Sequence, residues 1–313
     1  MSQVIAIGPY SDTDAAALAR DFDARRLPDL AAIAALPEDQ RRDIVAVAFM
    51  GHDPFGGAVM DLLPGLKAIT NFGVGYDAID VAAATARGIR VTNTPNVLND
   101  DVADLAVAMW IAQARDFEPA IQNARSGDWG RGIKLPLARK ASGRRVGILG
   151  MGRIGREIAD RLAAFKTEIH YQSRSRKDTP AGWTYHADPV ELARAVDDLI
   201  VAVVGGPETE GFVSAGVIGA LGPDGVIVNI ARGSVIDEEA LIAALQSGAI
   251  RGAALDVFRG EPQVDPRLLA APNLLALPHI GSATVETRAA MGQLQRANLR
   301  AILDERAPET PVN

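Results

Sequence analysis

The chain has 313 residues, which is long for a single hydrophobic core and favours two domains. Its formal net charge of −7 argues against nucleic acid or an anionic membrane as the main partner. Cysteine is absent, which excludes disulfides, thiolate chemistry and cysteine ligands to a metal. We expect no metal site.

The N-terminal residues MSQVIAIGPYSD predict a first strand rather than a signal peptide, because no basic segment precedes the short apolar run Val4–Ile7. No stretch approaches the ~18–20 consecutive apolar residues that a membrane-spanning helix needs. We therefore expect a cytoplasmic protein without a membrane partner.

Short β-branched runs alternate with alanine-rich helical stretches along almost the whole chain. The predicted strands, in chain order, are Val4–Ile7, Ile44–Phe49, Leu66–Thr70, Ile89–Thr92, Arg145–Leu149, Glu168–Gln172, Leu199–Val204, Val226–Ile230 and Ala253–Val257. This alternation is typical of βαβ units and parallel sheets. The predicted fold class is α/β, with two doubly wound parallel-sheet domains.

Two long helical patterns suggest how the domains connect. Asp101–Arg115, which Asn99 or Asp100 can cap, should carry the chain from the first domain into the second. The last helix, Ala283–Leu303, should return to the first domain. The predicted domains are therefore residues 1–98 plus 281–313, which form a discontinuous flavodoxin-like substrate domain, and residues 99–280, which form a Rossmann dinucleotide-binding domain.

A glycine fingerprint opens the first helix of the second domain. In VGILGMGRIG, Gly150 allows a tight turn, Gly152 lets the backbone approach a pyrophosphate, and Gly155 lets the helix Arg153–Phe165 pack closely on the strand. The helix N-terminus then offers N–H groups to the phosphates. The alternative is a glycine turn without a ligand, but the strand before it and the strand beyond favour a dinucleotide.

The residues after the next strand bear on the choice of cofactor. An NAD site places an acidic residue there to bind the ribose 2′-hydroxyl, but this chain has Ser173-Arg174-Ser175. Serine and arginine suit a 2′-phosphate, so we expect NADPH to be preferred and NADH to bind more weakly. The alternative is a solvated basic loop.

Three separated residues each lie in a loop after a strand-like run: Arg232, Glu261 and His279. A guanidinium can bind a carboxylate bidentately and polarise a neighbouring keto oxygen. Histidine suits proton donation near neutral pH, and a carboxylate beside it would orient the ring. Taken singly, each could be a surface or structural residue; together they indicate reduction of a 2-oxo acid.

The chain resembles the D-isomer-specific 2-hydroxyacid dehydrogenases over nearly its whole length. The matching segments are NFGVGYDAIDV, VTNTPNVLNDDVADLA, VGILGMGRIG, VNIARGSVIDEEAL, GAALDVFRGEP and LPHIGSATVETR. The resemblance is strongest to the glyoxylate/hydroxypyruvate reductase branch, including hydroxyphenylpyruvate reductases. It implies an NADPH-preferring enzyme that reduces glyoxylate, hydroxypyruvate or an aryl pyruvate to a D-2-hydroxy acid.

The resemblance also implies residue roles. Arg232 would bind the substrate and His279 would donate the proton, with Glu261 as its partner. Further substrate contacts would come from Val74, Gly75 and Ser282. The cofactor would meet Gly150, Gly152, Arg153, Ile154, Gly155, Ser173, Arg174, Ser175, Val204, Ile230, Asp256 and Gly281, with Asp256 orienting the carboxamide. The family implies a homodimer, with contacts near the helix after Asp100 and near Trp129.

The sequence departs from the family pattern at two places, and two alternative functions stay open. Gly205-Gly206-Pro207 replaces the family's Pro- or Leu-Thr segment next to the expected cofactor contact Val204. The loop Trp129–Leu137, where the family would place a substrate contact from a second subunit, is short and basic. A short phosphoglycerate dehydrogenase and a cofactor-sensing binding protein are the alternative functions. Formate oxidation is disfavoured, because formate enzymes carry glutamine where this chain has Glu261.

Overall fold

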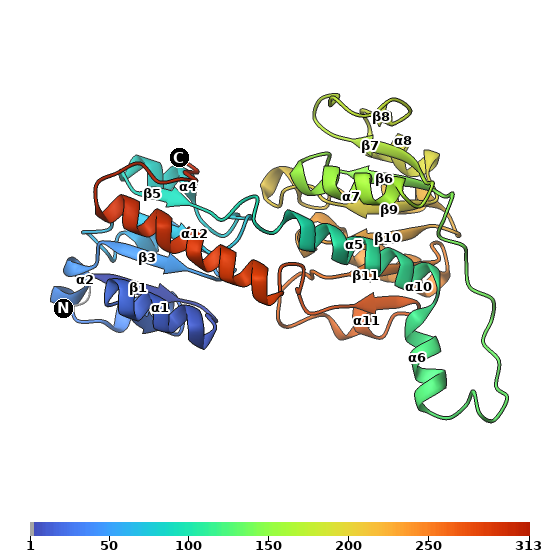
Figure 1. Cartoon of the computed structure of the whole chain (residues 1–313), viewed down its shortest axis with the longest axis horizontal. Helices are drawn as coiled ribbons and strands as arrows, with labels where there is room; N and C mark the ends of the chain where they lie inside the picture. The colour runs from blue at the N-terminus through green and yellow to red at the C-terminus, as the bar shows by residue number, and fades with distance from the viewer. Residues whose placement is uncertain (1–2) are drawn as a thin grey trace. The chain divides into compact units, whose positions relative to one another are not determined.

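The computed structural model describes residues 3–313, and the chain divides into two compact units (Figure 1). The first unit contains the chain up to Leu98 together with Ala283–Asn313. The second unit is Asn99–Ser282. In Figure 1 the first unit therefore carries both the blue and the red ends of the colour scale, whereas the second runs from green to orange.

The first unit is built on a parallel sheet with the strand order β2-β1-β3-β4-β5, the order of flavodoxin-like folds. Its strands are β1 (Val4–Ile7), β2 (Arg25–Leu27), β3 (Ala46–Phe49), β4 (Ala68–Asn71) and β5 (Arg90–Thr92). The three central strands, β1, β3 and β4, are buried along their whole length, because helices cover both faces of a parallel sheet.

The helices of this unit include the last helix of the chain. They are α1 (Asp12–Phe22), the 3₁₀ helix η1 (Ala31–Ala35), α2 (Glu38–Asp43), α3 (Gly57–Met60), α4 (Val81–Ala86) and α12 (Val285–Leu303). The buried Gln295 of α12 donates hydrogen bonds to the Tyr10 hydroxyl at 2.8 Å and to the Thr70 carbonyl at 2.7 Å. These buried bonds fix α12 against β4 of the first unit.

The second unit has a parallel sheet in the order β12-β11-β10-β9-β6-β7-β8. Its strands are β6 (Arg145–Leu149), β7 (Glu168–Gln172), β8 (Thr184–His186), β9 (Asp198–Val201), β10 (Val226–Asn229), β11 (Gly252–Leu255) and β12 (Leu274–Ala276). From β6 the chain first builds outward to β8 and then returns to β9, on the other side of β6. This reversal is the switch point of a Rossmann sheet, where ligands bind at the carboxyl ends of the strands.

Helices cover both faces of this second sheet. The helices of this unit are α5 (Asn99–Ala114), α6 (Phe117–Arg125), α7 (Arg153–Ala163), α8 (Pro189–Ala195), η2 (Pro207–Thr209), α9 (Ala215–Leu221), η3 (Gly233–Val235), α10 (Glu238–Ser247) and α11 (Pro266–Leu269), of which α6 extends away from the sheet. The apolar residues of α8, α9 and α10 form one core cluster with alternate side chains of the strands. Across residues 3–313, no helix combines the length and apolar character that spanning a membrane requires.

The two doubly wound parallel sheets confirm the predicted fold class. The structure adds two strands, β2 and β8, and the strand-like run before His279 forms a third strand, β12. All three lie at an edge of their sheet, and none is fully buried. Edge strands need no continuous apolar run, so their sequence signal is weak. The predicted cap of the linking helix was also wrong, because α5 begins at Asn99 and contains both Asn99 and Asp100.

Candidate active site

The loops that carry Arg232, Glu261 and His279 follow three neighbouring strands of the second unit. Arg232 comes after β10, Glu261 after β11 and His279 after β12. Because the three strands are parallel, these loops leave the sheet at the same carboxyl edge. The side chains thus belong to the edge at which a Rossmann sheet binds its ligands.

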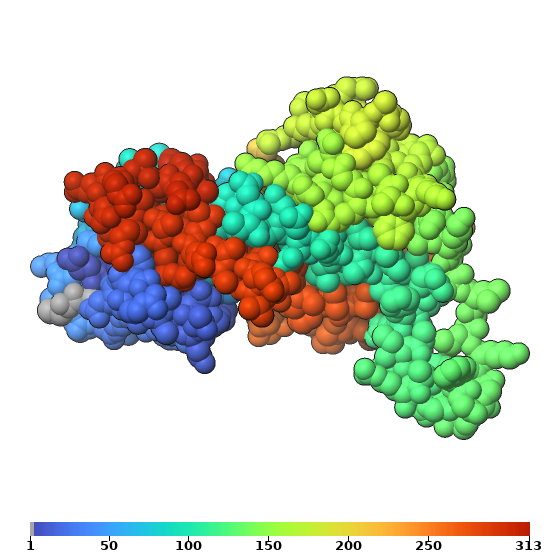
Figure 2. Space-filling view, viewed as in Figure 1, coloured from blue at the N-terminus to red at the C-terminus, as the bar shows by residue number. Residues whose placement is uncertain are grey.

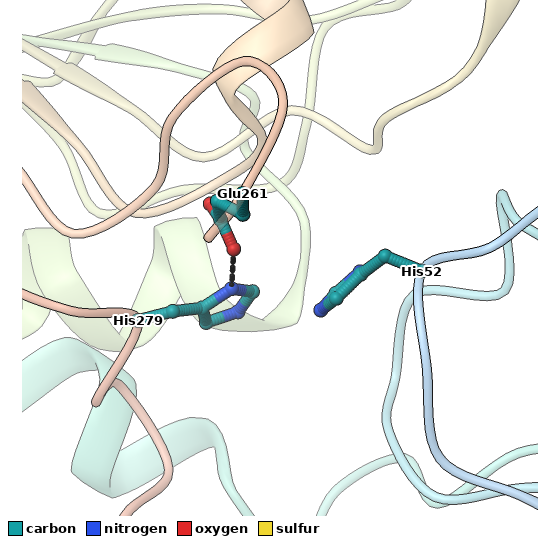
Figure 3. Close-up of side chains that lie close together, drawn as sticks. All are labelled: His52, Glu261 and His279. Atoms are coloured by element: carbon teal, nitrogen blue, oxygen red, sulfur yellow. Dashed lines mark hydrogen bonds and ion pairs between the residues drawn. The ribbon is translucent and has the colours of Figure 1, made fainter. Parts of the chain in front are cut away.

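Glu261 and His279 form a direct pair at this edge (Figure 3). Glu261 Oε2 lies 2.6 Å from His279 Nδ1. The other carboxylate oxygen accepts a hydrogen bond from the Phe258 N–H at 2.6 Å, so both oxygens of Glu261 are held. The Glu261 side chain is 18% exposed and that of His279 is 33% exposed, so the ring is oriented but still reachable by a ligand.

The His279 loop is fixed by a buried carboxylate. Asp256 is 2% exposed and accepts hydrogen bonds from the N–H groups of Ile280 at 2.7 Å and Gly281 at 2.8 Å. Burial raises the pKa of Asp256 above its ordinary value, and the two N–H donors partly oppose that rise. His279 itself has a φ of 53°, a left-handed conformation that few residues other than glycine adopt. The loop is therefore held in a strained form that orients the imidazole.

Arg232 is positioned by its own loop and by the loop after β9. The buried Asn229 donates to the Arg232 carbonyl at 2.9 Å and accepts from the Ala231 N–H at 3.0 Å. A Cβ atom at Gly205 would lie 2.4 Å from Arg232 Cγ. Glycine in the unusual Gly205-Gly206-Pro207 segment thus leaves the room that the Arg232 side chain occupies.

The glycine fingerprint has the geometry that a dinucleotide site requires. Gly150 has a φ of 103°, and a Cβ at Gly155 would lie only 2.0 Å from the Gly150 carbonyl oxygen. A Cβ at Gly152, in contrast, would meet nothing within 4 Å, so the space above this residue is open. The N–H groups of Arg153, Ile154 and Gly155 make no hydrogen bond within residues 3–313. These residues fit a pyrophosphate at the N-terminus of α7.

The hydroxyl groups of two tyrosines hold the backbone of the basic loop after β7. The Tyr171 hydroxyl donates to the Lys177 carbonyl at 3.2 Å, and the Tyr185 hydroxyl donates to the Ser173 carbonyl at 3.3 Å. The Ser173 hydroxyl donates to the Ser175 carbonyl at 2.7 Å, so it ties the loop together. Arg174 is exposed and has no hydrogen bond or ion pair within the described chain.

The remaining predicted residues are spread over both units. Val74 and Gly75 lie in the first unit, in the loop after β4. Ser282 is the last residue of the second unit and is half-buried. Val204 is 73% exposed, whereas Ile230 is 9% exposed.

Three supporting residues were missed by the sequence analysis: Asn71, Asn93 and Asn229. Each is a buried asparagine at or just after the carboxyl end of a strand. Burying an amide is costly unless its hydrogen bonds are satisfied, so an asparagine inside an apolar strand signature is the signal that could have revealed them.

Comparisons with known proteins agree with this geometry. Residues 107–281 match the model of the D-isomer specific 2-hydroxyacid dehydrogenase family, NAD binding domain. Among curated relatives, the hydroxyphenylpyruvate reductase of Plectranthus scutellarioides is 43% identical over 278 residues, which cover 89% of this chain and 87% of the relative. Glyoxylate/hydroxypyruvate reductase A of Arabidopsis thaliana is 43% identical over 277 residues, covering 88% of each chain.

A solved structure is similar over the whole chain. It is the NADPH-dependent glyoxylate/hydroxypyruvate reductase of Sinorhizobium meliloti in complex with NADP and malonate, with a TM-score of 0.93 and 43% identity. The match covers 100% of this chain and 97% of that one. On the family match, the sequence identity and the shared fold, this chain belongs to the D-isomer-specific 2-hydroxyacid dehydrogenases, a family of NAD(P)-dependent oxidoreductases.

Proposed function

We propose that the protein reduces small 2-oxo acids to D-2-hydroxy acids with NADPH. One observation carries the proposal: a carboxylate and an imidazole 2.6 Å apart at the ligand-binding edge of a dinucleotide sheet. The named relatives supply the substrate candidates, which are glyoxylate, hydroxypyruvate and hydroxyphenylpyruvate.

His279 would protonate the oxygen of the keto group as the nicotinamide, when bound, supplies the hydride. The Nδ1 atom of His279 faces Glu261, so we assign delivery of the proton to Nε2. Glu261 would keep the ring in this orientation, since its second oxygen is anchored by the Phe258 N–H. The pair would thus hold one proton at one defined atom until the hydride arrives.

The substrate carboxylate would be bound by charge and by backbone N–H groups. The guanidinium of Arg232 can form two hydrogen bonds with a carboxylate, and it lies in a loop fixed by Asn229. Val74 and Gly75 would contribute N–H groups, and Ser282 a hydroxyl, as the family resemblance implies. Recognition of a carboxylate beside a keto group would then select 2-oxo acids over simple aldehydes.

The cofactor would bind along α7 and the loop after β7. The open N–H groups of Arg153, Ile154 and Gly155 would meet the pyrophosphate. The side chains of Ser173, Arg174 and Ser175 would surround the ribose 2′-phosphate, with NADH bound more weakly. Val204, Ile230, Asp256 and Gly281 would line the remainder of the cofactor site.

The first test is turnover. Purified protein should consume NADPH, followed as absorbance at about 340 nm, when glyoxylate or hydroxypyruvate is added, and the glycerate formed from hydroxypyruvate should be the D-isomer. A substrate panel that includes hydroxyphenylpyruvate and 3-phosphohydroxypyruvate, run with both cofactors, ranks the candidates. Cofactor binding without turnover of any 2-oxo acid would contradict the proposal and favour a sensing protein.

We also propose that the protein is a homodimer formed through the arm, residues 117–137. Six large apolar side chains of this arm are exposed: Phe117, Ile121, Trp129, Ile133, Leu135 and Leu137. The arm begins with α6 and extends away from the sheet of its own unit (Figures 1 and 2). Exposed apolar surface of this kind indicates an interface, and a second copy is the commonest partner of such a surface.

A further inference from the structure

In the first unit, the loop after β4 has an unusual pattern of hydrogen bonds. The carbonyl groups of Gly73, Val74 and Gly75 are occupied. The Gly73 carbonyl accepts from Asn71 Nδ2 at 3.1 Å and from the Thr94 N–H at 2.9 Å, and the Gly75 carbonyl accepts from Asn71 Nδ2 at 2.8 Å. The Val74 carbonyl accepts from Asn93 Nδ2 at 2.8 Å. The N–H groups of Val74 and Gly75, in contrast, have no hydrogen-bond partner in the described chain.

The geometry of the peptide bond links the occupied carbonyl groups of this loop to its two N–H groups without a partner in the described chain. In a trans peptide, the carbonyl of one residue and the N–H of the next lie in one plane and point in opposite directions. Holding the Gly73 carbonyl therefore orients the N–H of Val74, and holding the Val74 carbonyl orients the N–H of Gly75. Asn93 is the side chain that holds the second of these peptides.

Asn93 is itself held by a segment distant in sequence. The Thr310 hydroxyl donates to the Asn93 carbonyl at 2.6 Å. The same hydroxyl accepts from Asn298 Nδ2 at 2.7 Å, and the Thr310 N–H donates to Asn298 Oδ1 at 3.1 Å. Asn298 is 0% exposed and Asn93 is 9% exposed, so the network is shielded from competing water.

We propose that Asn93 is a positioning residue for the 2-oxo acid, which it serves by orienting the Gly75 N–H toward the substrate carboxylate, and that Thr310 and Asn298 hold Asn93 in place. This inference rests on the proposed function of Val74 and Gly75. Burying amides and hydroxyls costs free energy unless all their hydrogen bonds are made, whereas apolar residues in the same place would carry no such cost. Here the network fixes the N–H group of Gly75, which otherwise binds nothing in the described chain.

The main test replaces Asn93 with leucine, which has a similar size and no charge. Asn93→Leu removes the donor to Val74, so the peptide can rotate. We expect the KM for glyoxylate and the inhibition constant of oxalate each to rise roughly tenfold or more, since hydrogen bonds to a charged group are the stronger kind. The KM for NADPH should stay within about twofold, because the cofactor is held by the second unit.

Thr310→Val is the second variant, because it removes only the hydroxyl that supports Asn93. The KM for glyoxylate and the inhibition constant of oxalate should rise here too, but by a smaller factor than in Asn93→Leu. Thr167→Val is the matched control: the Thr167 hydroxyl also donates to a backbone carbonyl, that of Leu162 at 2.8 Å, but between α7 and β7 in the second unit. Its kinetic parameters should equal those of the wild type.

The outcomes separate the two proposals. A wild-type enzyme that reduces glyoxylate, combined with unchanged oxalate inhibition in both Asn93→Leu and Thr310→Val, would overturn the positioning role and leave the reductase intact. A wild type that binds NADPH but reduces no 2-oxo acid would instead contradict the proposed function. Equal losses for glyoxylate and NADPH would mean that Asn93 supports the fold in general, which also overturns the inference.

Discussion

At the scale of single residues, the conformation of His279 links backbone strain to the proposed chemistry. Its φ of 53° lies in the left-handed region, and the buried Asp256 holds the two residues that follow. Strain of this kind persists only where the surroundings determine it. Other loops are held in the way that Asp256 holds the His279 loop, by a buried side chain that hydrogen-bonds to backbone groups. These side chains are Asn71, Asn93 and Asn229, each next to a residue proposed to contact the substrate.

Replacing His279 with asparagine should separate the proton donor from the backbone that carries it. Asparagine tolerates a positive φ, so the loop should keep its form. We expect the turnover number to fall by roughly 10²–10⁴ if proton donation is lost, with NADPH affinity little changed. The measurement is steady-state reduction of glyoxylate together with NADPH binding. His186→Asn, the same change at another histidine of this unit, is the control, and near-normal turnover of His279→Asn would show that the donor is misassigned.

At the scale of elements, the loop after β7 depends on β8, an edge strand that the sequence analysis missed. Tyr185 of β8 donates to the Ser173 carbonyl, and the guanidinium of Arg176 lies over the Tyr185 ring at 5.3 Å from its centre. The edge strand thus shapes a loop whose side chains are proposed to choose between NADPH and NADH. Arg174 is exposed in that loop, as are Ser175, Arg176 and Lys177.

Arg174→Ala should therefore weaken the binding of NADPH and leave the binding of NADH almost unchanged. The variant loses a charge-assisted contact with the 2′-phosphate, which NADH does not carry. We expect the KM for NADPH to rise roughly tenfold or more, since such hydrogen bonds are worth about 1.5–3 kcal/mol, while the KM for NADH stays within about twofold. Arg194→Ala, an exposed arginine of α8, is the control. Equal effects on both cofactors would remove the argument for NADPH.

At the scale of the whole molecule, the exposed arm is the feature that the fold of one chain leaves unexplained. Leu137 is 97% exposed and Trp129 is 77% exposed, although apolar side chains of this size are more often buried. The arm is anchored at its far end by a hydrogen bond from the Arg139 N–H to the Ala114 carbonyl at 2.9 Å. A second copy that covers the arm would remove this apolar surface from water.

The double variant Trp129→Glu with Leu137→Asp should shift the protein from dimer to monomer. Placing charges in an apolar interface is costly, whereas the same residues on a free surface are tolerated. Sedimentation velocity of the wild type and the variant measures the change. Leu269→Asp, at an apolar residue of α11 that is 53% exposed, should leave the dimer intact. A wild type that is monomeric at micromolar concentration would contradict the proposal.

Much of the architecture followed from the sequence because strands, caps and glycine turns are local. The strands β6 and β7 agree with the predicted runs residue by residue. Asp237 caps α10 by accepting from the Ala240 N–H, and Gly248 ends that helix in the left-handed conformation. The edge strands β2 and β8 escaped prediction, because their partly exposed residues carry no apolar pattern.

The sequence by itself determined which residues follow which strands. It therefore determined that an arginine, a glutamate and a histidine lie in three loops of one domain, each after a strand. Only the tertiary structure decided that Glu261 and His279 meet at 2.6 Å and that Asp256 and Asn229 hold the loops around them. It likewise decided that Thr310 supports Asn93 across 217 positions of sequence. The physical reason is that local sequence patterns set secondary structure, whereas contacts between distant loops depend on which strands lie next to each other in the folded sheet.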